Sequence, residues 1–311
     1  MNNKPTLTGA NKMFFVFTAI FLAYQLILGM LLGSSLNEHI YIIIIANEVL
    51  IALSVLVYSI AKKLNLKETF RLNKLGIVPA LLIIAASLPA TYAAGMFNSL
   101  LIYLLQFIGD IPVQSIPTPD SLQQLMAGIV VIGVMPAVCE EIMHRGLMLK
   151  AYERRGSYKA IVFTAILFGL FHFDITNLLG PIFLGLIIGY YVVRTNSIFA
   201  GMLAHFMNNA IAVVLRFLTR RYVKETVDLS GAEFKASIIL GLGSLFVVLV
   251  LMYAFTIVTR GKSAVNPRIS GIRQDIRAVF THWPIVLVIL LYIFTVILFV
   301  LSIAAKKIYG A

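Results

Sequence analysis

Long apolar segments without charge limit what this chain can fold into more than any other feature of its sequence. Residues 13–32, 75–109, 236–259 and 283–305 contain no Asp, Glu, Lys or Arg. A helix crosses a hydrocarbon core about 30 Å thick with about 20 apolar residues, so each segment is long enough. The mean hydropathy of +0.95 and the charged fraction of 12% agree with this. We therefore predict an all-α, polytopic transmembrane helical bundle.

Apolar segments that are shorter or contain a few charged residues complete the set of candidate spans. We expect about eight or nine spans in total, with the active site among the central helices. The long segment 75–109 contains Pro79 and Pro89, which indicate a kinked, tilted or partly interfacial helix. The first span is expected to be an uncleaved anchor, because it is too long for a signal peptide. The remaining candidates are 40–61, 122–149, 161–172, 178–193 and 198–215.

Composition also excludes several classes of protein. A chain this apolar has too few polar side chains for a cytosolic globular enzyme, a nucleic-acid binder or a disordered protein. The single cysteine, Cys139, excludes an intramolecular disulfide and a CxxC metal site. The sequence predicts one integral membrane domain over residues 1–311. Within it, 122–218 is the expected catalytic helical core, and 1–74 and 236–311 are flanking membrane helices.

The distribution of Lys and Arg predicts the orientation in the membrane. Basic residues concentrate in 62–74, 150–159 and 260–277, which share one side if the spans alternate. The positive-inside rule then places the N-terminus in the cytoplasm, in a protein of the cell membrane. The basic segment 216–235 falls on the opposite side in this arrangement and disagrees with the positive-inside rule, so the topology after residue 218 is less well determined. The net charge of +12 indicates anionic lipid headgroups as partners and no nucleic acid.

Ionisable side chains within the apolar segments are the functional candidates, because charge in the hydrocarbon region is unfavourable. Several of them fall in the hexapeptide 140–145. On a helix, Glu141 and Arg145 are four residues apart and can form an ion pair. Glu140 and His144 have the same spacing on a face rotated by about 100°. The complete set is Glu48, Glu140, Glu141, His144, Arg145, His172 and His205.

Depth in the membrane brings three of the spans together. Counting about 1.5 Å per residue from the predicted cytoplasmic ends, Glu140 lies roughly 15 Å deep and His172 roughly 15–20 Å deep. His205 lies roughly 10 Å deep, and Asn209, on the same helical face, roughly 16 Å deep. A lone intramembrane His is more often a hydrogen-bonding group between helices than a catalytic one. The agreement in depth favours a shared site.

Other features of these spans have structural interpretations. Pro136 has no N–H for the carbonyl of Ile132, which predicts a kink in the helix. Gly185 and Gly189 form a GxxxG motif, typical of closely packed membrane helices. Cys139 adjoins the candidate carboxylates in sequence but points about 100° away on the helix, so we interpret it as a packing residue.

The polar residues of these three spans form motifs that resemble those of the CPBP family. This family comprises CAAX proteases and bacteriocin-processing enzymes, also called Abi or type II CAAX prenyl endopeptidase-like proteins. It shows EExxxR, FxxxH and HxxxN on successive transmembrane helices, and the resemblance covers about 135–215. His144 departs from the family, in which an aromatic residue often precedes the arginine; it adds a third imidazole to the site or is a local substitution. Here the motifs read Glu140-Glu141-Ile-Met-His-Arg145, Phe168-Gly-Leu-Phe-His172 and His205-Phe-Met-Asn-Asn209.

The resemblance implies an intramembrane endopeptidase that hydrolyses a peptide bond near a C-terminus or in a membrane-associated peptide. Peptide hydrolysis needs an activated water, a stabilised oxyanion and a proton for the leaving amine. We expect Glu140 to activate the water, with His172 holding it or sharing its proton. His205 and Asn209 are expected to stabilise the oxyanion. The supporting residues are Glu141, Arg145 and His144.

Two mechanisms and several partners stay open at this point. The same residues suit a metal-free glutamate mechanism or a divalent metal, above all zinc, bound by Glu140, His172 and His205. We favour the metal-free site, because the sequence has no compact HExxH motif. The expected substrate is a membrane-associated peptide or protein, prenylated or not. The alternatives are a proton-coupled transporter, or a non-catalytic immunity or scaffold protein of the same fold. Glu48 either extends the polar site or bonds a neighbouring helix.

Overall fold

The computed structural model describes residues 3–112, 116–222, 226–261 and 270–309, and its architecture is helical. Within these residues, eight long apolar helices can cross a membrane, and a shorter apolar helix covers Ser157–Phe171. The prediction of an all-helical, multi-pass integral membrane protein is confirmed. The elements in chain order are α1 (Leu7–Leu32), η1 (Gly33–His39), α2 (Ile40–Ala61), α3 (Leu66–Thr69), α4 (Ile77–Leu105), β1 (Ile111–Pro112), α5 (Leu122–Gly128), η2 (Ile129–Val134), α6 (Met135–Glu141), η3 (Ile142–Met148), α7 (Leu149–Tyr152), η4 (Glu153–Arg155), α8 (Ser157–Phe171), η5 (Ile175–Asn177), α9 (Leu179–Thr195), α10 (Ile198–Thr219), η6 (Arg220–Tyr222), β2 (Thr226–Val227), α11 (Gly231–Val258), α12 (Ile272–Phe280) and α13 (Trp283–Tyr309).

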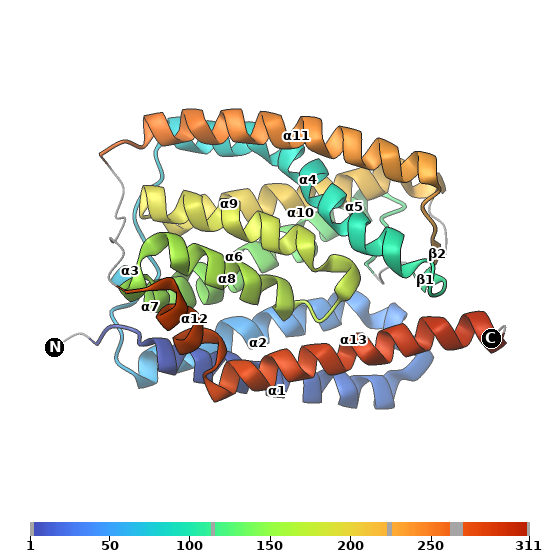
Figure 1. Ribbon diagram of the computed structural model, residues 1–311, viewed down its shortest axis with the longest axis horizontal. Helices are drawn as coiled ribbons and strands as arrows, with labels where there is room; N and C mark the ends of the chain where they lie inside the picture. Colours follow the sequence, from blue (N-terminus) through green and yellow to red (C-terminus); the bar gives the residue numbers. More distant parts are fainter. Residues whose placement is uncertain (1–2, 113–115, 223–225, 262–269, 310–311) are drawn as a thin grey trace.

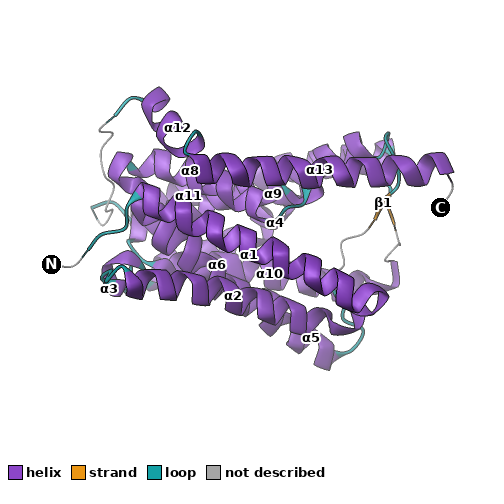
Figure 2. Cartoon of the chain, turned by 90° about the horizontal axis from the view of Figure 1, so that it is seen from below, coloured by secondary structure: helices purple, strands orange, loops and turns teal. Residues whose placement is uncertain are grey.

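The long helices form layers around a central group. Figure 1 shows α4 and α11 along one side, α6, α8, α9 and α10 in the middle, and α1, α2 and α13 on the opposite side. Figure 2 shows α1 lying between α2 and α13. The motif helices are therefore covered on both sides. Large apolar side chains on the outer helices are exposed, such as Leu31 at 76% and Phe246 at 69%, as expected for surfaces that face lipid.

The loops divide between two ends of the bundle. At one end a buried ion pair joins Arg71 to Glu153, and Asp275 binds Arg155 and Lys159. This groups 62–74, 150–159 and the part of 260–277 that the structure describes, as alternating spans require. At the other end the two-residue strands β1 and β2 pair antiparallel. Parts of two basic segments, 223–225 and 262–269, lie outside the described residues. Which end faces the cytoplasm remains a prediction.

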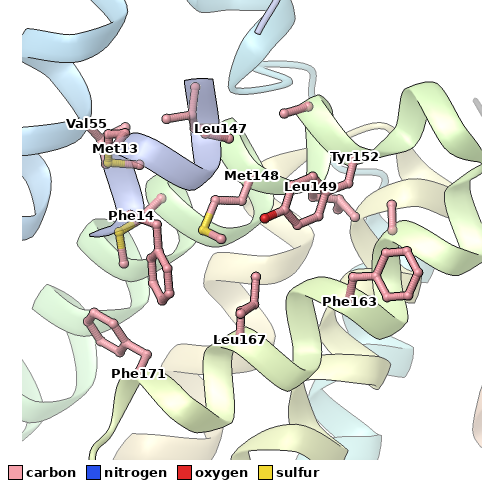
Figure 3. Packing of buried hydrophobic residues seen from close by; sticks show 14 of the residues in the cluster. Met13, Phe14, Val55, Leu147, Met148, Leu149, Tyr152, Phe163, Leu167 and Phe171 are labelled. Atoms are coloured by element: carbon pink, nitrogen blue, oxygen red, sulfur yellow. The ribbon is translucent and has the colours of Figure 1, made fainter. Parts of the chain in front are cut away.

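Apolar side chains from α1, η3 and α8 pack together in one buried core. Met13 and Phe14 pack with Leu147, Met148 and Phe171 in the core shown in Figure 3. All five are nearly or fully buried. The first span thus forms part of the core and supports the motif helices directly.

Glycines allow α8 and α9 to approach closely, as the GxxxG motif predicts. A Cβ on Gly185 would lie 2.9 Å from Cα of Ala165, and one on Gly189 would lie 3.1 Å from Ile161. Real Cβ atoms almost never come within 3.0 Å of another atom. A larger residue at 185 would therefore push α9 away from α8, the helix that bears the FxxxH motif.

The fourth span is irregular around Pro136. The π-helical segments η2 and η3 flank α6, and Pro136 lies in the first turn of α6. The N–H of Met135 bonds to the carbonyl of Val130, five residues back. We predicted a kink at the proline, and the structure has a π-helical stretch before it. Such stretches are rare and frequent at functional sites.

Candidate active site

Glu141 is fully buried at the centre of a cluster of polar side chains, which we call the polar cluster. Its other members are Glu140, Arg145 and His205. Oε1 of Glu141 accepts hydrogen bonds from Nη1 of Arg145 at 2.7 Å and from Nδ1 of His205 at 3.0 Å. The predicted Glu141–Arg145 ion pair is confirmed. A Cβ on Gly201 would lie 2.6 Å from Oε2 of Glu141, so α10 approaches this carboxylate only because residue 201 is glycine.

His205 is oriented by this carboxylate. An ionised carboxylate only accepts hydrogen bonds, so Nδ1 of His205 carries a hydrogen and Nε2 points the other way. Nε2 lies 3.9 Å from Oε2 of Glu140, beyond hydrogen-bond distance. Glu141 therefore holds the His205 imidazole so that its Nε2 faces the carboxylate of Glu140. A buried carboxylate that orients a histidine in this way is a recurrent catalytic arrangement.

His172 is held by its own helix. Its Nδ1 lies 2.8 Å from the carbonyl oxygen of Phe168, which can only accept, so Nδ1 is the protonated nitrogen. In the neutral ring, Nε2 then keeps its lone pair. The Phe168 ring packs edge to face with His172 and His205, and the guanidinium carbon of Arg145 lies 4.3 Å from its centroid. Phe168 thus joins the three polar groups of the site.

Asn209 makes a hydrogen bond to the helix backbone just before Pro136. Its Nδ2 donates to the carbonyl oxygen of Ile132 at 3.0 Å, and its Oδ1 accepts from Asn208 at 3.2 Å. Ile132 is the residue whose carbonyl Pro136 cannot serve. The motif asparagine therefore supplies a donor where the proline removes one. One of its two amide hydrogens remains for another acceptor.

His144 takes no part in the polar cluster. It is fully buried, and its Nδ1 bonds to the carbonyl oxygen of Glu140 at 3.0 Å. Its ring packs edge to face against Phe14, Phe168 and Phe171. Of the two interpretations of this residue, the structure therefore supports the local substitution, because the imidazole occupies an aromatic environment.

A cavity of about 360 Å³ lies beside the cluster and is lined by residues of several helices. His172, His205 and Asn209 line it, so the structure brings these predicted site residues to one space. Arg216, two turns beyond Asn209 on α10, lines it as well. Glu140 does not line the cavity and is 8% exposed. Its carboxylate reaches the cavity only past His205 or after a side-chain movement.

Glu48 lies on the far side of Glu140. It is 5% exposed, and its helix α2 packs against α6. Glu48 is close enough to Glu140 for the two carboxyl groups to interact electrostatically. Its Oε2 is buried and has no hydrogen-bond partner among the described residues. Of the two interpretations of Glu48, this position supports the one that extends the polar site. Cys139 itself belongs to the apolar core.

The predicted metal ligands do not form a compact donor set in the described part of the chain. No three His, Cys, Asp or Glu side chains there come together in a group that could hold a metal ion. The Nδ1 hydrogen bonds of His172 and His205 do not count against a metal, because a metal-bound histidine commonly donates its other ring N–H to a carbonyl or carboxylate. Because the described residues lack a compact three-ligand set, they do not fit a zinc site as they stand, and we derive no step through a metal.

Sequence reasoning missed several residues of the site. Gly201 and Ile132 carry no motif signal, because their role is a close approach and a backbone carbonyl. Phe168 is the first residue of FxxxH and could have been found from it. Arg216 follows Asn209 by seven residues, which places it on the same helical face, and this spacing was a usable signal.

Comparisons with known proteins agree with the motifs. Residues 122–211 match the family model described as Rce1-like, type II CAAX prenyl endopeptidase Rce1-like. Over 108 residues the chain is 27% identical to the protein of Bacillus subtilis (strain 168) named "Putative membrane peptidase YdiL". That match covers 34% of this chain and 44% of the relative, so less than half of the relative is spanned. No solved structure matches the chain significantly. The resemblance to the CAAX endopeptidase family is confirmed over the matched residues.

Proposed function

We propose that this membrane protein, whose residues 122–211 match the Rce1-like family model, is an intramembrane endopeptidase. The observation that carries the proposal is the pairing of Glu141 with His205 beside a cavity that His172 and Asn209 also line. A buried carboxylate, two oriented imidazoles and an amide around one space are suited to activating water and holding an oxyanion.

The proposed reaction is direct attack of water on the peptide carbonyl. Glu140 takes a proton from the water, and the lone pair on Nε2 of His172 holds the water by accepting its other hydrogen. His205 in its doubly protonated form, through its Nε2–H, and the second amide hydrogen of Asn209 donate to the oxyanion that forms. The C–N bond then breaks, and the proton on Glu140 passes to the leaving nitrogen. Glu141 and Arg145 fix the position of His205.

Arg216 supports cleavage near a C-terminus. Its guanidinium lines the cavity and makes a hydrogen bond to the carbonyl oxygen of Ile116 at 3.1 Å, with no acidic partner among the described residues. A substrate carboxylate could form an ion pair with this guanidinium. Eleven residues of helix separate His205 from Arg216, roughly 16 Å, which an extended peptide covers with about five residues. The scissile bond is therefore expected within about five residues of the carboxylate.

The cavity also bears on the side from which substrate comes. It extends along α10 from His205 towards Arg216, the end of the bundle where β1 and β2 pair. With the N-terminus in the cytoplasm, this end faces away from the cytoplasm. We therefore propose a membrane-associated peptide that is reached from that side. Lipidation of the substrate, including prenylation, is not needed for this proposal.

The experiment that tests the function is a search for accumulating substrates. Membranes of cells that express the wild-type chain and of cells that express Glu140→Gln are compared by quantitative peptide mass spectrometry. Uncleaved membrane peptides should accumulate only in the variant, and their shortened forms should occur only with the wild type. Identical peptide profiles at equal levels of folded protein would contradict the proposal.

A further inference from the structure

A second cavity lies away from the catalytic cluster, between α1 and α2. Its volume is about 940 Å³, and it opens on the outside of the bundle. One part of its wall is apolar and includes Val16, Phe17, Ile20, Leu53 and Val57. Val16 and Val57 are 53% and 63% exposed, so the apolar wall is accessible from the surrounding lipid. We call this space the α1–α2 groove.

The end of the α1–α2 groove nearest the N-terminus is cationic. Lys4, Lys12 and Lys62 line it, and the groove lining contains no acidic residue. All three lysines are exposed, and none forms an ion pair within the described part of the chain. The positive end of the α1 dipole also lies here, with no acidic residue in its first turn. Three lysine side chains without acidic partners and the N-terminus of α1 therefore lie at one end of the groove, beside its apolar wall.

Hydroxyl groups lie among the cationic and apolar residues of the groove. Thr8, Ser54 and Tyr58 all line the groove. The Tyr58 hydroxyl fits against α1 only because residue 9 is glycine, since a Cβ there would collide with it. The hydroxyl groups are interspersed with the lysines and the first apolar residues, so the lining changes from cationic and polar to mainly apolar along the direction of the helices.

The length of the groove matches one leaflet. From Leu7 to Ile20 the helix rises roughly 20 Å, and half of a hydrocarbon core is about 15 Å. A phospholipid has matching chemistry along its length: an anionic phosphate and polar glycerol and ester oxygens at one end, and an acyl chain at the other. We propose that the α1–α2 groove is a binding site for one phospholipid with an anionic headgroup. Its phosphate would bind the lysines, and one acyl chain would lie along the apolar wall.

Native mass spectrometry of the full-length chain in detergent tests this site. The probes are dioleoyl phosphatidylglycerol, dioleoyl phosphatidylcholine and water-soluble glycerol 3-phosphate. We expect retention of one phosphatidylglycerol per chain, weaker binding of phosphatidylcholine and no retention of glycerol 3-phosphate. Binding of glycerol 3-phosphate as tight as that of the lipid would overturn the lipid assignment in favour of a phosphate site.

Charge and shape variants locate the lipid. Each surface lysine contributes about a factor of five to binding an anionic lipid, so Lys12→Gln with Lys62→Gln should weaken phosphatidylglycerol binding about 30-fold at low ionic strength. Val16→Trp should weaken it by filling the apolar wall without a change of charge. The matched control is Lys67→Gln with Lys74→Gln, exposed lysines at the same end outside the groove. Equal loss in the control, or none with either groove variant, would refute the site.

Discussion

Substitution of Asn209 separates a structural from a chemical role for the motif asparagine. Its Nδ2 donates to the Ile132 carbonyl at 3.0 Å, and Pro136 leaves that carbonyl without its α-helical donor. The sequence alone predicts that Asn209→Ala leaves the fold intact and lowers turnover roughly a hundred-fold or more. The observed bond adds a loss of stability to this expectation.

The size of this loss follows from the surroundings of the bond. A buried acceptor that loses its donor costs about 1–3 kcal/mol, whereas hydrogen bonds between membrane helices average about 0.6 kcal/mol. Ile132 is only half-buried and lines the cavity, so we expect about 1 kcal/mol. Because Pro136→Ala restores the missing backbone N–H, Asn209→Ala should cost almost nothing in that background.

A double-mutant cycle measures this coupling. The free energy of unfolding in mixed micelles is determined for the wild type, both single variants and the double variant. Asn208→Ala is the control, because Asn208 bonds to Thr91 and Asn209 but not to the helix backbone of the fourth span. Its cost should be the same in both backgrounds. Equal costs of Asn209→Ala in the wild-type and Pro136→Ala backgrounds would refute the reasoning.

Turnover in the same four proteins reports on the oxyanion role. A donor to the oxyanion typically contributes about 10²–10³ in rate, and Pro136→Ala cannot replace it. If Asn209 serves both roles, Pro136→Ala rescues the stability of the Asn209→Ala variant and leaves its turnover low. Recovery of turnover together with stability would show that Asn209 acts only as a positioning residue.

Three further outcomes follow from the structure. Arg145→Ala leaves the Glu141 charge buried without its ion-pair partner, so it should lower stability by about 3–5 kcal/mol and reduce the yield of folded protein, measured by size-exclusion chromatography. Arg216→Gln should abolish any preference for peptides with a free C-terminal carboxylate over the corresponding amides, measured as the ratio of kcat/KM values, and Arg220→Gln should not. Burial alone would raise the pKa of Asp275, but hydrogen bonds from Lys159, Ser270 and Arg155 outweigh it and lower the pKa to about 2. The stabilisation by Asp275, about 2 kcal/mol, is therefore complete above about pH 5 and lost progressively as pH falls through about 2, so the difference in Tm between wild type and Asp275→Asn should shrink over that range.

The helices and the motif contacts were predictable because they depend on short-range patterns. Charge-free segments of sufficient length define the spans, and the four-residue spacing of Glu141 and Arg145 places them side by side. The meeting of His205 with these residues followed from matching depths. The interpretation of Gly185 and Gly189 as a close-packing motif needed no knowledge of the partner helix.

The remaining features depend on three-dimensional packing that no local pattern encodes. The bond from Asn209 to Ile132 joins residues 77 positions apart and depends on the π-helical register before Pro136. The position of Glu48 depends on which face of α2 packs against α6. The exclusion of Glu140 from the cavity lining depends on its side-chain rotamer, which its place in the motif does not determine.

The most direct test of the central proposal is cleavage by purified protein. The wild-type chain and Glu140→Gln are reconstituted in liposomes with a pool of apolar synthetic peptides, and new termini are identified by mass spectrometry. The two proteins should show the same Tm, because Glu140 makes no side-chain hydrogen bond or close ion pair within the described residues. We predict defined fragments with the wild type and none with Glu140→Gln. Fragments at near wild-type rates with Glu140→Gln, or none with either protein across the pool, would contradict the account.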